Sequence, residues 1–198
     1  MKNRFLENIK KNNLFSKEDK LIVAISGGAD SVALAILLNE CNFPIIFAHC
    51  NFNLREDESD ADEDFVRKLA KELEIECFVE SFETEKFAKE NKISIQMAAR
   101  ELRYSWLEKI RIKTDSKYIA VAHHKDDDIE TYFINLIRGS GIRGFLGMKE
   151  KKNKIIRPLL NLRRDEIESY LMLKNQEFRT DSSNTDTKYL RNNIRKHI

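Results

Sequence analysis

The sequence alternates short apolar runs with longer amphipathic stretches, and this alternation leaves very few folds open to the chain. Four runs rich in Ile, Val and Phe predict strands over residues 21–25, 44–48, 77–82 and 118–122. Apolar residues at helical spacing between these strands predict helices over residues 31–40, 59–73 and 94–113. Strands and helices in this order form right-handed βαβ crossovers, which predicts an α/β fold built on a doubly wound, Rossmann-like parallel sheet.

The chain beyond Ile129 is expected to be mostly helical. A glycine-rich stretch and a short strand over residues 155–156 interrupt it, and helices are expected over residues 164–174 and 185–196. We expect one domain over residues 1–198, whose C-terminal portion, residues 150–198, is mostly helical and basic. Residues 151–198 hold 12 Lys and Arg against 6 Asp and Glu, although the whole chain has a net charge of +2. A basic end attracts a polyanion, but a solvated helical surface explains the same charges.

The composition excludes several classes of protein. Of the 198 residues, 41% are hydrophobic and 34% are charged, which allows a core and argues against general disorder. No apolar run reaches the roughly 18 to 20 residues of a membrane-spanning helix, and the first residues do not form a secretory signal. The three cysteines are unclustered, which argues against a disulfide framework or a zinc site. We therefore expect a cytoplasmic protein without a membrane partner.

The most informative local pattern is SGGADS, residues 26–31, directly after the first predicted strand. Gly27 and Gly28 let the backbone approach a ligand closely, and the helix that begins here offers N–H groups to phosphate oxygens. Ser26 and Ser31 add hydroxyl donors. Asp30 suits a phosphate neighbour only where a divalent cation bridges the two, so it predicts bound Mg²⁺. The alternative makes the glycines a simple turn, with Asp30 and Ser31 as helix caps.

Acidic residues follow the fourth predicted strand, in the segment HHKDDDIET over residues 123–131. Ligands of doubly wound sheets gather at the carboxyl ends of strands, near the point where strand order reverses. If the first and fourth strands are neighbours, this segment faces the glycine pair. Asp127 and Glu130 are three residues apart at the start of a helix and so share one face, which suits a cation or an amine. The alternative has helix-capping aspartates and solvent-exposed histidines.

Two pairs of arginines are candidates for phosphate contacts. Arg100 and Arg103 lie on the predicted helix over residues 94–113, where ordinary surface charges are the alternative. Arg191 and Arg195 are four residues apart and share a helix face that suits phosphate or an anionic leaving group. A G-x-G-x-x-G pattern begins at Gly139, but it follows a helix rather than a strand, so it is not a dinucleotide-binding motif.

The segment SGGADS resembles the SGGxDS loop of the PP-loop ATP pyrophosphatases, which cleave ATP between its α- and β-phosphates and adenylate a substrate. Seven segments in series resemble the catalytic domain of the bacterial tRNA(Ile)-lysidine synthetase family over essentially the whole chain. These segments occupy residues 26–31, 49–55, 98–104, 123–131, 138–144, 157–160 and 191–195.

The resemblance implies an ATP-dependent carbon–nitrogen ligase that modifies tRNA. Such an enzyme joins free L-lysine to C2 of the wobble cytidine of tRNA(Ile) with a CAU anticodon, through an adenylated base, and releases AMP and pyrophosphate. It implies ATP and Mg²⁺ as requirements, and C-terminal tRNA-binding domains outside this chain. Whether the chain forms a homodimer is left open.

The resemblance also assigns roles to residues of this chain. ATP-binding residues are then Ser26, Gly27, Gly28, Ala29, Asp30, Ser31, His49 and Arg100, with Asp30 also holding Mg²⁺. Catalytic residues are Asp30, Asp127, Glu130, Arg191 and Arg195. Contacts with the substrate and the tRNA fall to Arg103, His124, Asp126, Arg138 and Gly139.

One departure and two alternatives accompany this interpretation. Family members often read HVNHGLR where this chain reads HCNFNLR over residues 49–55, so Phe52 replaces a histidine whose role is not carried over. A PP-loop tRNA thiolase would activate the base in the same way but usually needs paired cysteines, and Cys41, Cys50 and Cys77 have no C-x-x-C spacing. A nucleotide-binding module without catalysis is the other alternative.

Overall fold

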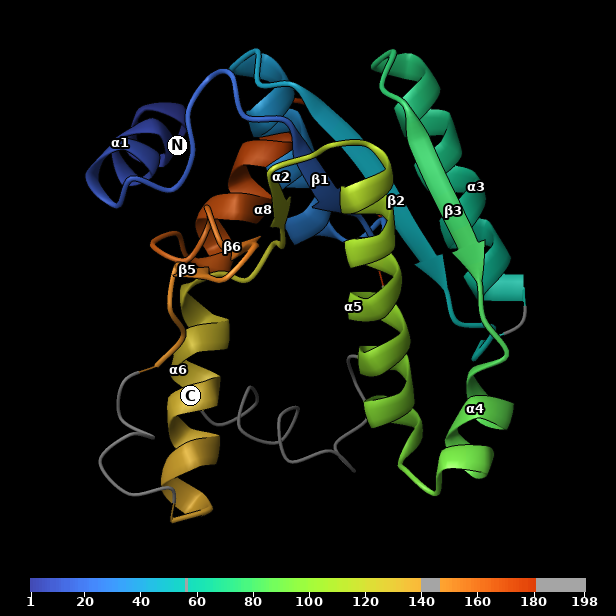
Figure 1. Ribbon diagram of the computed structural model, residues 1–198. Coiled ribbons are helices and arrows are strands. Elements are labelled where there is room, and N and C mark those ends of the chain that lie inside the picture. Colours follow the sequence, from blue (N-terminus) through green and yellow to red (C-terminus); the bar gives the residue numbers. More distant parts are fainter. Residues whose placement is uncertain (56, 140–146, 181–198) are drawn as a thin grey trace.

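The computed structural model describes residues 1–55, 57–139 and 147–180 as a single sheet with helices on both faces (Figure 1). The strands are β1 (Leu21–Ala24), β2 (Ile45–Asn51), β3 (Cys77–Ser81), β4 (Tyr118–Ala120), β5 (Lys151–Lys152) and β6 (Ile155–Ile156). The helices are α1 (Lys2–Lys11), α2 (Ala29–Glu40), α3 (Asp57–Glu72), α4 (Thr84–Asn91), α5 (Ile95–Lys113), α6 (Lys125–Ile137) and α8 (Arg164–Leu173).

The strand order confirms the predicted α/β fold with a doubly wound sheet. It runs β3-β2-β1-β4-β6-β5, and every neighbouring pair is parallel except the hairpin of β5 and β6. β1 is central and pairs with β2 on one side and with β4 on the other. The expected adjacency of the first and fourth strands is therefore confirmed, and the strand order reverses between them.

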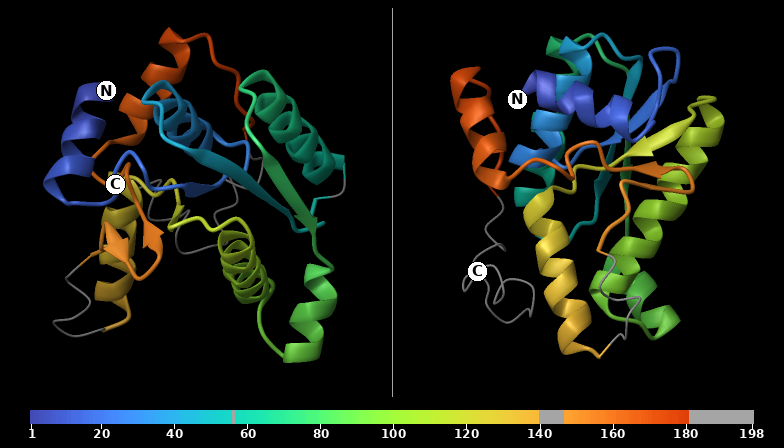
Figure 2. Two further views of the ribbon diagram at one scale, coloured as in Figure 1. Left: turned by 45° about the horizontal axis from the view of Figure 1, so that its top comes forward. Right: turned by 90° about the vertical axis from the view of Figure 1, so that its left-hand side faces the viewer.

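Alternating side chains of β1 pack into two separate apolar clusters. Leu21 and Val23 face the larger cluster, which includes buried residues of α1, α2, α3 and α8. Ile22 faces the other cluster, together with Trp106 and Leu107 of α5. The right-hand view of Figure 2 shows α1, α2 and α8 on one side of the sheet and α5 on the other. Apolar residues on both faces of β1 thus explain why helices cover the sheet on both sides.

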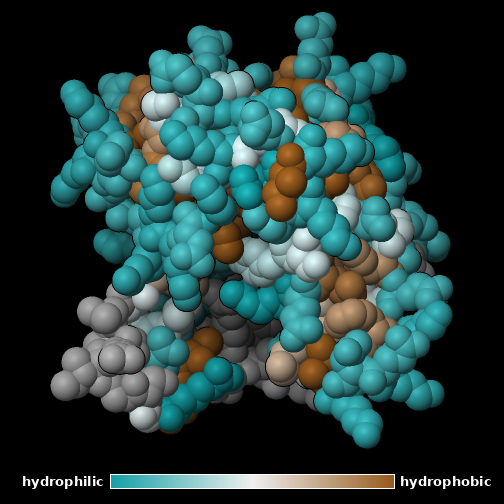
Figure 3. Space-filling model, viewed as in Figure 1, coloured by the Kyte–Doolittle hydropathy of each residue, from teal (hydrophilic) through white to brown (hydrophobic). Residues whose placement is uncertain are grey.

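The outer surface is mostly polar, and some apolar side chains near the start of α5 are exposed. Figure 3 shows hydrophilic residues over most of the face in view and hydrophobic ones at the lower right, over α4 and α5. Ile95 and Met97, in the first turn of α5, are 43% and 52% exposed. In the described part of the chain, no helix combines the length and apolar character needed to cross a bilayer.

Several elements differ from the sequence-based expectations. α1, α4 and β5 were not expected, and α6 begins at Lys125, four residues before Ile129. β2 continues beyond residue 48 to Asn51 because its last residues still pair with β3. Over residues 150–180 the structure has two short strands and one helix, while the helix expected over residues 185–196 lies outside the described residues.

Leu34 offers a test of the packing of α2 between the sheet and α8. Its side chain is fully buried, so Leu34→Ala should lower the free energy of unfolding by about 3 kcal/mol, through lost apolar contact and a cavity. Met172 is 68% exposed, so Met172→Ala should change the free energy of unfolding by less than about 0.5 kcal/mol. Urea denaturation followed by circular dichroism measures both values, and equal effects would contradict this packing.

Candidate active site

The glycine loop connects β1 to α2 and is held by short-range hydrogen bonds. The Ser31 hydroxyl donates to the Gly28 carbonyl at 2.9 Å and lies 3.2 Å from the Ser26 backbone nitrogen, which donates to it. Gly27 has φ +89°, a conformation that L side chains rarely adopt. The N-cap of α2 is Gly28, so no side chain caps this helix. Asp30 and Ser31 are therefore not its caps, and the first N–H groups of α2, which have no partner within the helix, are available to a ligand.

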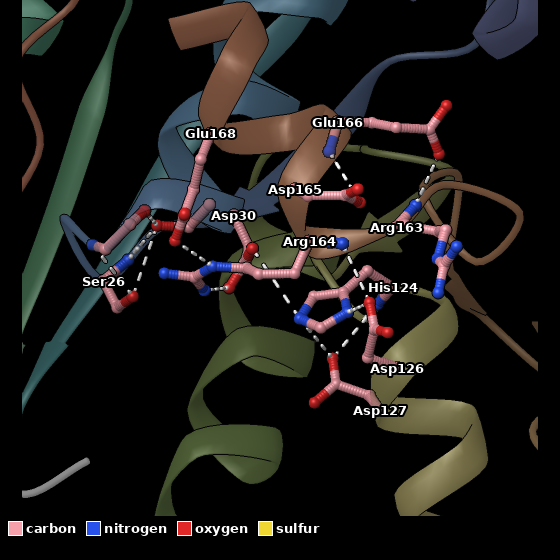
Figure 4. Close-up of polar contacts among 12 residues, drawn as sticks. Ser26, Asp30, His124, Asp126, Asp127, Arg163, Arg164, Asp165, Glu166 and Glu168 are labelled. Atoms are coloured by element: carbon pink, nitrogen blue, oxygen red, sulfur yellow. Dashed lines mark hydrogen bonds and ion pairs between the residues drawn. The ribbon is translucent and has the colours of Figure 1, made fainter. Parts of the chain in front are cut away.

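The acidic segment lies against this loop through a buried histidine. His124 is the N-cap of α6 and only 2% exposed. Its Nε2 lies 3.7 Å from Asp30 Oδ1 and 3.4 Å from Asp127 Oδ2, and its Nδ1 lies 3.3 Å from Asp126 Oδ2. Figure 4 shows Asp30 and Asp127 converging on the His124 ring from two elements. The structure thus brings the two ends of the candidate site together.

Asp127 is also a structural residue of α6. Its Oδ2 accepts the His124 backbone N–H at 3.0 Å, which closes the first turn of the helix. A helix-capping aspartate was one part of the alternative interpretation, and the structure contains it. The other part was a solvent-exposed histidine, which the burial of His124 contradicts. Glu130, one turn further along, is 3% exposed.

Arg164 joins the glycine loop to the acidic segment. Its Nη1 pairs with Asp30 Oδ2, and its backbone N–H donates to Asp126 Oδ2 at 2.8 Å. Its Nε donates to Glu168 Oε1 at 2.6 Å, one turn along α8. The sequence around Arg164 did not predict this role. The only signal was its place at the start of a helical pattern, and nothing local shows that Asp30, 134 residues away, is its partner.

Arg157 holds His123, the residue before His124, through a hydrogen bond. Its Nε donates to His123 Nδ1 at 3.2 Å and its Nη1 to the Lys149 carbonyl at 2.8 Å. Burial lowers the pKa of Arg157. Because His123 Nδ1 accepts this hydrogen bond, its neutral ring carries the proton on Nε2. The segment RPLL, residues 157–160, drew attention in the sequence, but the contact with His123 could not be read from it.

His49 lies at the end of β2, beside the end of β1, and is 3% exposed. Its Nδ1 lies 2.9 Å from the Ile25 carbonyl, an acceptor, so Nδ1 carries the proton and donates. Its Nε2 is a buried acceptor with no hydrogen-bond partner among the described residues. Burial lowers the pKa of His49, which keeps the ring neutral. A neutral acceptor at this sheet edge suits a donor group of a ligand.

Arg179 holds the glycine loop from the outside. Its backbone N–H donates to the Gly27 carbonyl at 2.9 Å, and it forms an isolated parallel bridge with Gly28. Its Nε pairs with Asp62 Oδ1 at 3.0 Å, while Arg55 pairs with Asp62 Oδ2 at 2.9 Å. No local sequence pattern predicts the contact between Arg179 and Gly27, because the two residues are 152 positions apart. We call the Arg179 contact with Gly27 and Gly28 the strap.

The remaining candidate residues are more scattered. The Arg103 guanidinium lies 5.2 Å from the ring of Phe52, which stacks on Phe82, and the Arg100 guanidinium lies 4.9 Å from the Tyr104 ring. Both arginines belong to α5, and these ring contacts do not connect them to the glycine loop. Two others follow α6: Arg138, its C-cap, and Gly139 with φ +65°. Arg191 and Arg195 lie outside the described residues.

The carboxylates of Asp30 and Asp127 suit a hard cation that arrives bound to a nucleotide. Mg²⁺ is commonly held by one or two carboxylates together with substrate phosphates, and Asp30 and Asp127 converge beside the glycine loop. Across residues 1–55, 57–139 and 147–180, no three His, Cys, Asp or Glu side chains form a complete metal site. The residues therefore fit a cation that arrives on a nucleotide, and not a preformed cage.

Comparison with known proteins agrees with this geometry. The sequence profile of the PP-loop domain family, ATP_bind_3, matches residues 1–198, the whole chain. The chain belongs to the PP-loop domain family. Use of ATP is a property of this family of ATP pyrophosphatases, and the glycine loop of this PP-loop domain occupies the expected place between β1 and α2.

Curated relatives carry one common name. A tRNA(Ile)-lysidine synthase of Bacteroides thetaiotaomicron is 49% identical over 195 residues, which cover 98% of this chain and 46% of the relative. A tRNA(Ile)-lysidine synthase of Porphyromonas gingivalis is 49% identical over 198 residues, which cover 99% of this chain and 44% of the relative. The PP-loop chain thus spans less than half the length of these two relatives.

Solved structures share the fold at lower identity. The U34-tRNA thiolase NcsA from Methanococcus maripaludis, with its 4Fe-4S cluster, has a TM-score of 0.80 at 21% identity, covering 99% of this chain and 71% of that one. The NH3-dependent NAD synthetase from Campylobacter jejuni has a TM-score of 0.61 at 17% identity, covering 98% and 83%. These likenesses confirm the predicted Rossmann-like α/β architecture.

The buried neutral His49 makes a testable contribution to pH-dependent stability. Its pKa in the folded protein is below the unfolded value of about 6.5, so the unfolded state binds more protons as the pH falls. We expect the free energy of unfolding to decrease from pH 7 to pH 5, with a His49 contribution of at most about 1.4 kcal/mol per pH unit. His49→Asn, which retains a donor for the Ile25 carbonyl, should make this slope shallower. Equal slopes in urea denaturation series would contradict the assignment.

Proposed function

We propose that this chain is the catalytic portion of a tRNA(Ile)-lysidine synthase. It uses ATP to activate the wobble cytidine of tRNA(Ile) with a CAU anticodon, and it joins free L-lysine to C2 of that base. The observation that carries this proposal is the meeting of Asp30 and Asp127 at His124, which sets a phosphate-binding loop opposite buried carboxylates. The names of the curated relatives support the same activity.

The glycine loop accounts for ATP binding and for the first step. The N–H groups at the start of α2 and the Ser26 hydroxyl are donors for phosphate oxygens. The Ser31 hydroxyl donates to the Gly28 carbonyl and so supports the loop that presents these donors. In this step cytosine O2 attacks the α-phosphorus, an O–P bond forms, and the bond to the β-phosphate oxygen breaks to release pyrophosphate. Donors fixed before the reaction stabilise the charge that develops on the phosphates.

Mg²⁺ bound with the nucleotide would be held by Asp30, with Asp127 as the second carboxylate nearby, and would neutralise phosphate charge. Asp30 reaches this position because it lies in the first turn of α2, directly after the glycine pair. Before the nucleotide and its cation bind, His124 and Arg164 hold its carboxylate in place.

Buried carboxylates account for the second step. The lysine amine attacks C2 of the adenylated base, the C2–O bond breaks, and AMP leaves. The amine must lose a proton to react, and a nearby carboxylate serves as the acceptor. Asp127 and Glu130 lie on one face of α6, are 7% and 3% exposed, and are the candidates for binding this amine. Water has little access to either group.

The substrate side of the site carries aromatic and cationic groups. Arg103 is exposed and lies over Phe52, which stacks on Phe82. Guanidinium groups and aromatic rings stack on unpaired bases, and an anticodon base can be turned out at little cost. Arg138 and Gly139 remain candidates for tRNA contacts. His124 is buried and Asp126 accepts the Arg164 backbone N–H, so we assign His124 and Asp126 to the support of the site and not to direct tRNA contacts.

The cysteines argue against a thiolase. Cys41 ends α2, Cys50 lies in β2 and Cys77 begins β3. In the register of β2 and β3, Cys77 is opposite Phe47 and Cys50 is opposite Glu80, so the two thiols are not paired across the strands. Burial raises the pKa of Cys50 to about 12 and that of Cys77 to about 11, which disfavours the thiolate needed to carry sulfur.

The direct test is incubation of the chain with ATP, labelled L-lysine and unmodified tRNA(Ile). Transfer of label to the tRNA, with release of AMP and pyrophosphate, is the expected result. Product that depends on a sulfur donor would favour the thiolase. ATP binding without any product would favour a nucleotide-binding module. The same assay is then repeated with this chain fused to the remaining part of a relative's sequence, which distinguishes loss of tRNA affinity from absence of catalysis.

Asp30 is the sharpest single test of base activation. Asp30→Asn removes the charge with little change of shape and should lower pyrophosphate release at least about 100-fold. Asp165→Asn, a matched change on the exposed start of α8, should leave the rate within about twofold. Thermal unfolding of both variants checks the fold. Unchanged pyrophosphate release by Asp30→Asn would refute the role assigned to Asp30.

Glu130 distinguishes binding of the amine from binding of the metal. Glu130→Gln keeps the shape of the buried side chain but removes its charge, so the KM for lysine should rise about ten- to hundredfold. The KM for ATP should stay within about twofold. Steady-state kinetics with each substrate varied measures both constants. A rise confined to the KM for ATP would instead assign Glu130 to the nucleotide and its cation.

A further inference from the structure

Arg164 is tied to three acidic residues on three helices. Its Nη1 pairs with Asp30 Oδ2 in the first turn of α2, and its backbone N–H donates to Asp126 Oδ2 in the first turn of α6. Its Nε pairs with Glu168 Oε1 on α8 at 2.6 Å. Figure 4 shows the Arg164 guanidinium extended toward Asp30, whereas the side chain of the neighbouring Arg163 is directed away.

The contacts of Arg164 mark a point where three helices begin close together. α2, α6 and α8 start at Ala29, Lys125 and Arg164, and the first turns of all three are linked by the hydrogen bonds just described. The positive ends of helices and a permanently charged guanidinium favour anions. Before any ligand binds, these positive groups compensate the carboxylates that gather here.

The contact with Asp30 places the guanidinium in competition with a cation. The carboxylate expected to face the divalent cation already has the Arg164 Nη1 on its Oδ2. A guanidinium and a divalent cation attract the same carboxylate and repel each other at contact distance. Binding of the cation at this oxygen therefore requires that Arg164 move away.

The surroundings of Arg164 allow such a movement. Its side chain is 40% exposed, so no closely packed core holds the guanidinium against Asp30. Glu168 is 39% exposed and lies one turn along the same helix. The bond from Arg164 Nε to Glu168 can therefore persist while Nη1 leaves Asp30, so that the charge of the guanidinium remains compensated.

We propose that Arg164 is a positioning residue that takes the place of the divalent cation at Asp30 until a metal-bound nucleoside triphosphate displaces it. This inference rests on the proposed function, because it takes Asp30 to be the carboxylate that faces the cation. In the cation-free protein the ion pair holds Asp30 in its productive position and reduces its repulsion of phosphates. The displaced guanidinium remains at the cluster, where phosphate oxygens are suitable acceptors.

The test measures binding, not turnover, with Mn²⁺ as the probe cation and α,β-methylene-ATP as a nucleotide that is not cleaved. Arg164→Gln, Arg164→Lys and wild-type protein are titrated with Mn²⁺ at saturating nucleotide and followed by electron paramagnetic resonance. Nucleotide affinity is measured separately in EDTA by calorimetry. Arg163→Gln is the matched control, since it removes the same charge from the start of the same helix.

The proposal predicts shifts of opposite sign. Arg164→Gln should bind Mn²⁺ about three to ten times more tightly, because the competing charge is gone, and should bind the nucleotide in EDTA about three to ten times more weakly. Arg164→Lys should stay closer to wild type on both measures, and Arg163→Gln should match wild type. A residue that merely supports the fold would weaken both kinds of binding when replaced.

Two results would overturn the proposal, and they are distinguishable. In the first, Asp30→Asn abolishes Mn²⁺ binding but Arg164→Gln binds Mn²⁺ no more tightly than wild type. This result would reject only the role of Arg164. Mn²⁺ binding that is insensitive to Asp30→Asn would reject Asp30 as the cation carboxylate. The metal assignment in the proposed function would then fall together with this inference.

Discussion

The parallel pairing of β1 with β4 is the contact on which the candidate site depends. Both strands end at the same edge of the sheet, and the strand order reverses between them, so the loops that follow must meet there. The loop after β1 carries Asp30 and the segment after β4 carries His124 and Asp127. The distance of 3.7 Å between His124 Nε2 and Asp30 Oδ1 follows from this pairing, although the two residues are almost a hundred positions apart in the chain.

The parts of this arrangement that the sequence predicted have strong local signals. Apolar residues on both faces of a strand, such as Leu21 and Ile22, require helices on both sides of the sheet, and the structure has them. The two glycines after β1 and the carboxylates after β4 indicated one ligand site, because parallel strands bring their carboxyl ends together. Assigning a particular substrate depended further on the resemblance of several separate segments to one family.

The parts that the sequence did not predict depend on contacts between distant segments. Arg164 and Arg179 are ordinary charged residues in their local context, and only contacts with residues far away in the sequence place them at the glycine loop. α1 has a mean hydropathy too low to stand out, yet Phe5 is fully buried in the main core. β2 extends to Asn51 because β3 supplies partners for its last residues, which a pattern of apolar residues cannot reveal.

The strap between Arg179 and the glycine loop has a consequence for mobility. Because the Arg179 N–H donates to the Gly27 carbonyl, a movement of the backbone at Gly27 must either break this hydrogen bond or carry Arg179 along. Movement of the loop at Gly27 is therefore coupled to movement of the segment after α8. Hydrogen exchange at the Arg179 amide would report how often the glycine loop and this segment separate.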